Sequence, residues 1–304
     1  MSSEYACVAS SLAVTLSSQD RDPPSVAMNY IRHVSWNDKP AANPGEHGKS
    51  PAPREPKILA DAANVLRTFN TWTFKREQPS DPQLLLRVVA EAMAARKPVP
   101  FLLYWGKGPR HEVAAPDQQC LDFLASLAER VRGAYAPGAA MRLILTDSHA
   151  ELNGHTAQNI ARYYDDVRSQ AQRRGFDTCL LGQLVKAAGS LATAAPLDDV
   201  VSAKMLESLI ASAQKWYRGD ATPEEGALAY LRMNLIEQRV VERAFPNSIF
   251  VTFNGSQLRP LFPRQLPIFY MYSLKRGVGV KPWFMSAEPT TAQRENQSDN
   301  FADV

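Results

Sequence analysis

Cysteine is scarce in this chain: Cys7, Cys120 and Cys179 are the three cysteines among 304 residues. They are odd in number and far apart, and no CxxC pair or His/Cys cluster has the spacing of a zinc site. They therefore predict neither a disulfide framework nor a structural metal. We expect reduced thiols, a cytoplasmic location and no bound metal ion.

Long apolar runs and an excess of one charge are also missing. A short apolar stretch at 8–14 follows Glu4 and has no Lys or Arg before it, unlike a signal peptide. No run reaches the roughly 18 apolar residues of a membrane-spanning helix. The 34 Lys and Arg against 31 Asp and Glu leave a net charge of +3, too little to predict a nucleic-acid partner. We expect small-molecule partners, no membrane contact and no nucleic acid, and the oligomeric state stays open.

What the chain does contain is enough apolar material, 45% of its residues, for a sizeable core. Residues 20–56 are rich in Pro, Asn, Asp, Gly and Ser, with one short apolar stretch at 26–31. Such a segment buries too little apolar area to offset its ordering entropy. The residues after Pro289 are equally polar. We predict a flexible extension at 1–56, one catalytic domain at 57–288 and a flexible tail at 289–304.

Helical and strand periods alternate through the folded region. Apolar spacing predicts helices at 58–69 and 80–93, the second with Ser80 as its N-cap, and a continuous apolar run predicts a buried strand at 99–105. Asp117 is expected to cap a helix that ends at residue 134, and strand 141–146, helix 156–174 and strand 176–181 follow. This alternation is typical of parallel sheets with right-handed crossovers.

Further elements are expected after this core. Helices at 200–217 and 223–244 and strands at 248–253 and 266–272 fit the pattern of apolar residues. We expect the strands to extend the sheet with at least one antiparallel pairing. The predicted fold class is α/β: a Rossmann-like, mostly parallel three-layer sheet with extra C-terminal helices and strands.

The first candidate site is the segment after the first strand, because open α/β sheets bind ligands at the carboxyl ends of their strands. Residues 106–111 include two glycines, Lys107 and Arg110. The glycines would allow a close backbone approach, and the two cations would supply countercharge to a phosphate or carboxylate. A solvated basic turn is the alternative.

The densest group of functional side chains follows the second strand, at 146–155. Asp147 comes directly after the strand, where the sheet would hold its carboxylate rigidly, and His149 can act as a general acid or base near neutral pH. We predict Asp147 and His149 as catalytic residues. A metal site at His149, Glu151 and His155 lacks a known ligand spacing. Capping of the following helix is the structural alternative.

Four side chains elsewhere are candidate substrate contacts. Tyr163 lies on the apolar face of a predicted helix and belongs either to the core or to the site. Arg232 and Glu237 interrupt an apolar stretch, where a buried ion pair, a site lining or an exposed helix face would each explain them. Asn254 follows a predicted strand and offers hydrogen bonds.

Short motifs follow one another in a defined order between residues 57 and 284. They are Lys97-Pro98 before the first strand, Lys107 after it, Pro116-Asp117 at a helix start, residues 135–139, Asp147 after the second strand, residues 245–249 and residues 281–283. This order and spacing resemble the isocyanide (isonitrile) synthase family, which includes enzymes that act on tyrosine or tryptophan. The family pattern has Asp-Gly-Arg where this chain has Asp147-Ser148-His149, and Ser-Ile-His where it has Thr252-Phe253-Asn254.

The resemblance implies a transferase or lyase that condenses an amino acid α-amino group with ribulose 5-phosphate. The ketone carbon of this co-substrate would become the isocyanide carbon, with no further cofactor. Lys107 and Arg110 would then bind the phosphate, while Asp147 and His149 would handle the amine. The alternatives are an aminoacyl-tRNA-dependent transferase of the cyclodipeptide synthase type and a non-catalytic small-molecule-binding protein.

Overall fold

The computed structural model describes residues 54–106, 112–189 and 201–271. Its strands are β1 (Val99–Trp105), β2 (Ala139–Leu145), β3 (Asp177–Leu180), β4 (Ile249–Thr252) and β5 (Ile268–Tyr270). Its helices are α3 (Arg54–Phe69), α4 (Pro82–Ala94), α5 (Ala115–Ala134), α6 (Asp147–Leu152), α7 (Ala157–Gln172), α8 (Leu181–Ala188), α9 (Ala203–Trp216), α10 (Pro223–Ala244) and the 3-10 helix η2 (Ser256–Leu261). Residues 1–53 and 272–304, which hold most of the predicted extension and all of the predicted tail, lie outside the described residues.

The strands form one five-stranded sheet in the order β3-β2-β1-β4-β5, and every strand pairing in it is parallel. The chain first builds outward from β1 to β2 and β3 and then returns to the other side of β1 with β4 and β5. This confirms the predicted α/β, Rossmann-like class. The strand order reverses between β1 and β4, which is the point where open α/β sheets usually bind ligands.

The predicted antiparallel pairing in the sheet is wrong. The connection from β4 to β5 passes through η2 and returns to the edge of the sheet where the strands begin. β5 therefore runs in the same direction as β4, and Phe250 pairs with Ile268 in parallel register. Among the described residues, the isolated antiparallel bridge joins Lys75 to Met271, outside the named strands.

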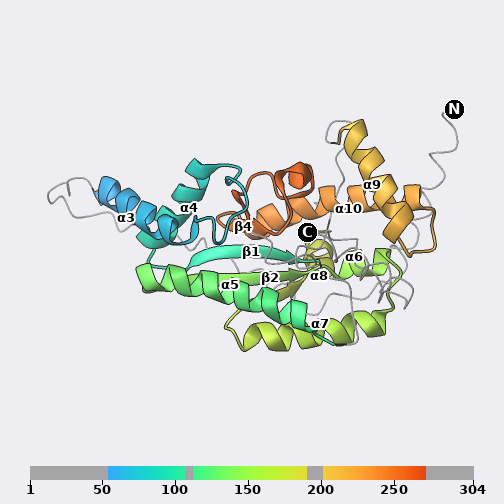
Figure 1. Ribbon diagram of the computed structural model, residues 1–304, viewed down its shortest axis with the longest axis horizontal. Helices are drawn as coiled ribbons and strands as arrows, with labels where there is room; N and C mark the ends of the chain where they lie inside the picture. The colour runs from blue at the N-terminus through green and yellow to red at the C-terminus, as the bar shows by residue number, and fades with distance from the viewer. Residues whose placement is uncertain (1–53, 107–111, 190–200, 272–304) are drawn as a thin grey trace, which may run out of the picture. The chain divides into compact units, whose positions relative to one another are not determined.

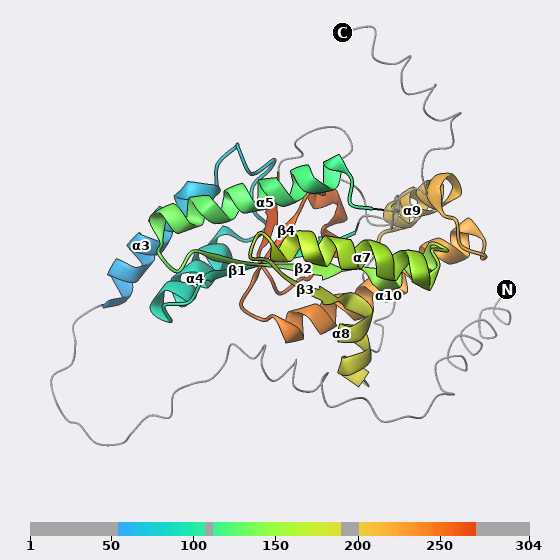
Figure 2. The ribbon, with the colours of Figure 1, turned by 90° about the horizontal axis from the view of Figure 1, so that it is seen from below.

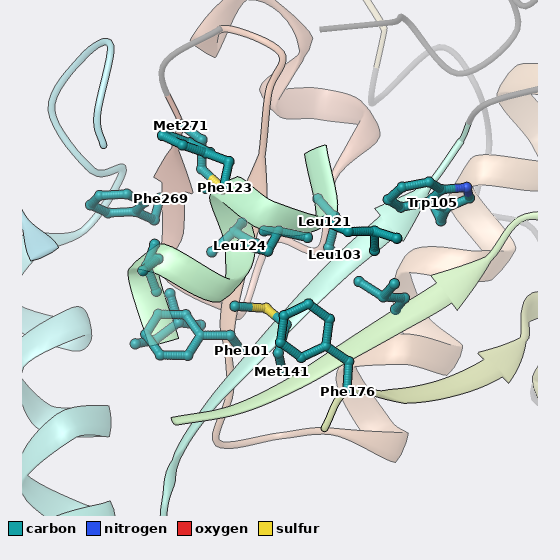
Figure 3. Packing of buried hydrophobic residues seen from close by; sticks show 14 of the residues in the cluster. Phe101, Leu103, Trp105, Leu121, Phe123, Leu124, Met141, Phe176, Phe269 and Met271 are labelled. Atoms are coloured by element: carbon teal, nitrogen blue, oxygen red, sulfur yellow. The ribbon is translucent and has the colours of Figure 1, made fainter. Parts of the chain in front are cut away.

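The core lies on both faces of the sheet because β1 is apolar throughout. Phe101, Leu103 and Trp105 alternate onto the face where they join Leu121 and Leu124 of α5 in one buried cluster (Figure 3). The intervening side chains of β1 point to the opposite face. Figure 1 shows α5 and α7 on one side of the strands and α10 on the other, and Figure 2 shows α5 and α7 from below.

The starts of two helices differ from the predictions. Asp81, not Ser80, caps α4: the backbone N–H of Leu84 donates to Asp81 Oδ1 at 2.8 Å. Ser80 Oγ instead accepts from the backbone N–H of Ile268 at 2.9 Å and so helps fix β5. Asp117 stands inside α5, where its carboxylate accepts from the backbone N–H of Ala114 at 2.9 Å. The Asp81 and Asp117 carboxylates each bond a backbone N–H three residues away at the start of their own helix, whereas Ser80 bonds a strand of the sheet.

Two helices at the carboxyl edge of the sheet were not predicted. α6 occupies most of the segment expected to be a loop, and α8 follows β3 without an intervening residue. Both are short, with six and eight residues. They carry the first side chains that emerge from β2 and β3, and they therefore set the geometry of the candidate site. No described helix combines the length and the apolar character needed to cross a membrane.

Candidate functional site

The site begins where β2 ends beside β1. Thr146 Oγ1 donates to the backbone oxygen of Trp105 at 3.1 Å and ties the ends of the two strands together. Asp147 is the first residue of α6, and its Oδ1 accepts from the backbone N–H of Gly182 at 2.8 Å. Gly182 lies in the first turn of α8, where free N–H groups favour a negative partner. The half-buried carboxylate of Asp147 is thus held between two helices.

On the same turn of α6, His149 and Ser148 share a buried carboxylate. His149 Nε2 lies 2.6 Å from Glu237 Oε2, and Ser148 Oγ donates to Glu237 Oε1 at 3.0 Å. His149 is 3% exposed and Glu237 is 0% exposed, so solvent does not screen their interaction. Glu237 comes from α10, which means that α10 holds the first turn of α6 through both carboxylate oxygens.

Two tyrosines surround this carboxylate. The ring of Tyr230 meets the His149 ring edge to face, with 5.3 Å between centroids. Burial raises the pKa of Tyr230 and of Tyr104, and the nearby charge of Glu237 raises both further. Both phenols therefore stay protonated at physiological pH. They offer neutral hydroxyl groups, which can donate hydrogen bonds, beside a carboxylate.

A second carboxyl group lies near Asp147 on the same helix. Burial raises the pKa of Glu151, and the charge of Asp147 raises it further. Glu151 is therefore more easily protonated than an ordinary glutamate when the pH falls. Among the described residues, no group of three or more His, Cys, Asp or Glu side chains could hold a metal ion. His149, Glu151 and His155 accordingly do not converge on one point.

Of the predicted site residues, the structure brings His149 and Glu237 into contact, whereas Asp147, on the same turn of α6, bonds to α8. Asn254 follows β4, and its backbone N–H donates to Thr252 Oγ1 at 3.1 Å. That position is at the carboxyl edge of the sheet, on the β4 side of the point where the strand order reverses. Lys107 and Arg110 lie outside the described residues.

Two other predicted residues lie elsewhere. The ion pair considered between Arg232 and Glu237 is wrong: Arg232 is exposed, while Glu237 pairs with His149. Five residues along a helix correspond to about 140° of rotation, so the two side chains leave opposite sides of α10. Tyr163 is fully buried in the core, where its hydroxyl accepts from Trp105 Nε1 at 3.3 Å. This position favours the core interpretation of Tyr163 over a substrate contact.

Sequence reasoning missed Ser148, Gly182, Tyr104 and Tyr230. Tyr230 precedes Glu237 by seven residues, which is two helical turns, so the two lie on one face of α10. That spacing was available in the sequence as a signal. The only sequence signal for Gly182 was its position directly after a short predicted strand, and no local pattern connected it with Asp147. Their proximity follows from the parallel register of β2 and β3.

Comparisons with known proteins give a likeness of fold. No family model matches the chain, and no curated protein matches it. Among solved structures, the PvcA protein from Pseudomonas aeruginosa is similar, with a TM-score of 0.57 and 18% sequence identity. The match covers 74% of this chain and 87% of PvcA. The likeness shows that the two proteins share a fold.

Proposed function

We propose that this protein is an isocyanide-synthase-like enzyme that condenses the α-amino group of an amino acid with ribulose 5-phosphate. One observation carries the proposal: on this fold, Asp147 and His149 stand on the first turn after β2, at the carboxyl edge of the sheet. The fold likeness to PvcA and the order of short motifs along the chain support it.

The chemistry of the condensation explains why these residue types are needed. Imine formation requires a substrate ammonium group to be oriented and deprotonated, and a ketone oxygen to be protonated. Asp147 uses Oδ1 to bind the Gly182 N–H, which leaves Oδ2 to bind an ammonium. His149 would then move protons between the amine and the ketone oxygen. Neither role needs a metal or a nucleotide.

The phosphate of ribulose 5-phosphate needs cations close to the same edge. We propose Lys107 and Arg110, in the segment that follows β1, for this role. Charge-assisted hydrogen bonds to phosphate contribute roughly 1.5–3 kcal/mol each, so Lys107→Ala should weaken ribulose 5-phosphate binding by about ten- to a hundredfold. Calorimetry with ribulose 5-phosphate measures this, and unchanged affinity would return the segment to a solvated turn.

The deciding experiment is an incubation with pooled amino acids and ribulose 5-phosphate labelled with 13C at its ketone carbon. We expect a product that depends on ribulose 5-phosphate, carries the label in its isocyanide carbon and forms equally well after ribonuclease treatment. Mass spectrometry measures how much product forms under each condition, and 13C spectra measure the position of the label. The absence of any labelled product from all the amino acids contradicts the proposal. Loss of product on ribonuclease treatment would favour the aminoacyl-tRNA-dependent alternative.

A variant at Asp147 separates catalysis from architecture. Asp147→Asn keeps the shape of the side chain and removes its charge, and loss of one positioned acid or base typically lowers the rate about 10²- to 10⁴-fold. The matched control is Asp220→Asn, at an exposed position, which should retain the full rate. An Asp147→Asn protein that is less stable but turns over at the full rate would show that Asp147 only anchors α8.

A further inference from the structure

The least explained group in this site is the carboxylate of Glu237. It is completely buried, and within the described residues its recorded hydrogen-bond partners are Ser148 and His149. Burial of a charged group is strongly unfavourable unless the group is paired and hydrogen-bonded. The sequence suggested that Glu237 binds substrate, but in this structure both of its oxygens are occupied by the first turn of α6. Its role must therefore be sought in what it does to that turn.

The contact with His149 determines where the imidazole proton sits. When the Glu237 carboxylate is ionised it can only accept hydrogen bonds, and the 2.6 Å contact then places a proton on His149 Nε2. Ser148 Oγ–H occupies the other oxygen and prevents the carboxylate from rotating away. The edge-to-face packing of Tyr230 restricts rotation of the ring. Together these contacts favour a proton on Nε2 over one on Nδ1.

The other imidazole nitrogen has no partner. His149 Nδ1 is buried and accepts no hydrogen bond from any described residue. The hydroxyl of Tyr104 is also buried without a hydrogen-bond partner among the described residues. The nearby charge of Glu237 contributes to the raised pKa of this hydroxyl. More than nine-tenths of buried polar groups in folded proteins are satisfied, so two such groups around one carboxylate call for a partner that the described residues do not supply. A substrate atom or a bound water can complete both hydrogen bonds.

We propose that Glu237 is a positioning residue that holds His149 as an Nε2-protonated imidazole and so makes Nδ1 the atom that accepts a proton from the substrate. In this step the lone pair of Nδ1 takes a proton from the substrate ammonium, directly or through one water. The ring becomes an imidazolium whose Nε2–H remains bonded to the Glu237 carboxylate, and the same proton later leaves Nδ1 for the ketone oxygen. The inference deepens the proposed function by naming the atom that moves the proton, and it rests on that function only in naming the substrate.

The protonation pattern can be measured without any substrate. The chain has five histidines, and 15N spectra of histidine-labelled protein resolve the two ring nitrogens of each, with His149→Gln used to assign the signals. We expect His149 to show a protonated Nε2 and an unprotonated Nδ1 at neutral pH. A protonated Nδ1 at that pH, in either the other tautomer or the imidazolium, overturns the proposal.

Two substitutions on α10 test whether Glu237 imposes this pattern. Glu237→Gln nearly preserves volume and removes the charge, so we expect the preference for the Nε2-protonated form to be lost. The matched control is Glu224→Gln, the same change at an exposed position of the same helix, which should leave the spectrum unchanged. An unchanged His149 spectrum in Glu237→Gln overturns the proposal. If Glu237→Gln does not fold, Ser148→Ala serves instead, because it removes the hydrogen bond that orients the carboxylate.

Kinetic measurements distinguish a positioning role of Glu237 from a merely structural one. Glu237→Gln should lower kcat by about 10- to 100-fold with KM within about twofold, because proton transfer is impaired and binding is not. The pH–rate profile of the variant should differ from that of the wild type, because the carboxylate beside the His149 ring is gone. A less stable protein with an unchanged profile overturns the proposal. If wild-type protein forms no product, the proposed function fails, while the 15N spectra still decide the role of Glu237.

Discussion

The contact between Gly182 and Asp147 gives the sharpest test of how the site is built. A Cβ atom added at Gly182 would lie 2.8 Å from Asp147 Oδ2 and 3.3 Å from its Cγ. Real Cβ atoms do not approach so closely, so Gly182→Ala must displace the carboxylate. Displacement breaks the 2.8 Å hydrogen bond from the Gly182 N–H to Asp147 Oδ1.

Two opposing effects determine the change in stability. Alanine favours a helix over glycine by at most about 1 kcal/mol. A hydrogen bond to a charged acceptor contributes about 1.5–3 kcal/mol, and the steric part is small because a carboxylate at the end of a side chain can turn away. The loss exceeds the gain, so we expect Gly182→Ala to destabilise the protein by ~1 kcal/mol, or about 2–4 °C in melting temperature. Turnover should also fall, because Asp147 leaves its position.

A double-mutant cycle assigns the effect to this contact. In an Asp147→Ala background the obstructing carboxylate is gone, so Gly182→Ala should be neutral or stabilising, and the coupling energy should be about 1–2 kcal/mol. Gly133→Ala in α5 is the control, since a Cβ there would meet no atom within 4 Å and should only favour the helix. Chemical denaturation of the four proteins of the cycle measures these energies. Additive effects within about 0.5 kcal/mol would refute the reasoning.

Three further predictions concern Cys179, Tyr163 and Glu225. Burial raises the pKa of Cys179 to about 12, so alkylation of the native protein at pH 8 should spare this thiol. Peptide mass spectrometry measures the modification, and modification of Cys179 at the rate of an unfolded control would contradict the prediction. Tyr163→Phe should lower stability by about 1 kcal/mol and leave KM unchanged, whereas a raised KM would restore Tyr163 as a substrate contact. Hydrogen bonds from Thr222 lower the pKa of Glu225, so its carboxylate stabilises the fold above its ordinary pKa, and this contribution is lost as the pH falls through the lowered value. Glu225→Gln should therefore lower the melting temperature at pH 7 and have a smaller effect near pH 3, and an equal effect at both values would exclude this role.

Elements with a long or continuous pattern could be predicted from the sequence. The strand expected at 99–105 matches β1 at both ends because seven apolar residues are bounded by breaks in the pattern. The helix expected at 223–244 matches α10, whose start is marked by Pro223 and by a reciprocal pair of hydrogen bonds between Thr222 and Glu225. Each of these elements carries its own start and stop signals in the sequence, so packing against neighbouring elements changes its ends little.

The candidate site could be predicted only in part. Asp147 and His149 were found because a polar residue after a buried strand stands at a ligand-binding edge whatever the rest of the chain does. The role of Glu237 depends on its contact with His149, which lies 88 residues away in the sequence. That contact forms only when α10 packs beside α6, and no local sequence pattern encodes it. The same reason explains Arg232, which shares the apolar stretch of Glu237 but leaves the other side of the helix.

The size of α6 connects the stability of the site to its chemistry. A helix of six residues has no stability of its own, because isolated helices shorter than about 12–15 residues are marginal in water. Its conformation must come from contacts with other elements, and both proposed catalytic side chains supply such contacts. Asp147 bonds to α8, while His149, together with Ser148, bonds to Glu237 of α10. A substitution that loosens either contact therefore changes both the melting temperature and the position of the reactive groups. For this reason stability alone cannot identify the catalytic residues, and the His149 proton and the pH–rate profile are the measurements that separate chemistry from architecture.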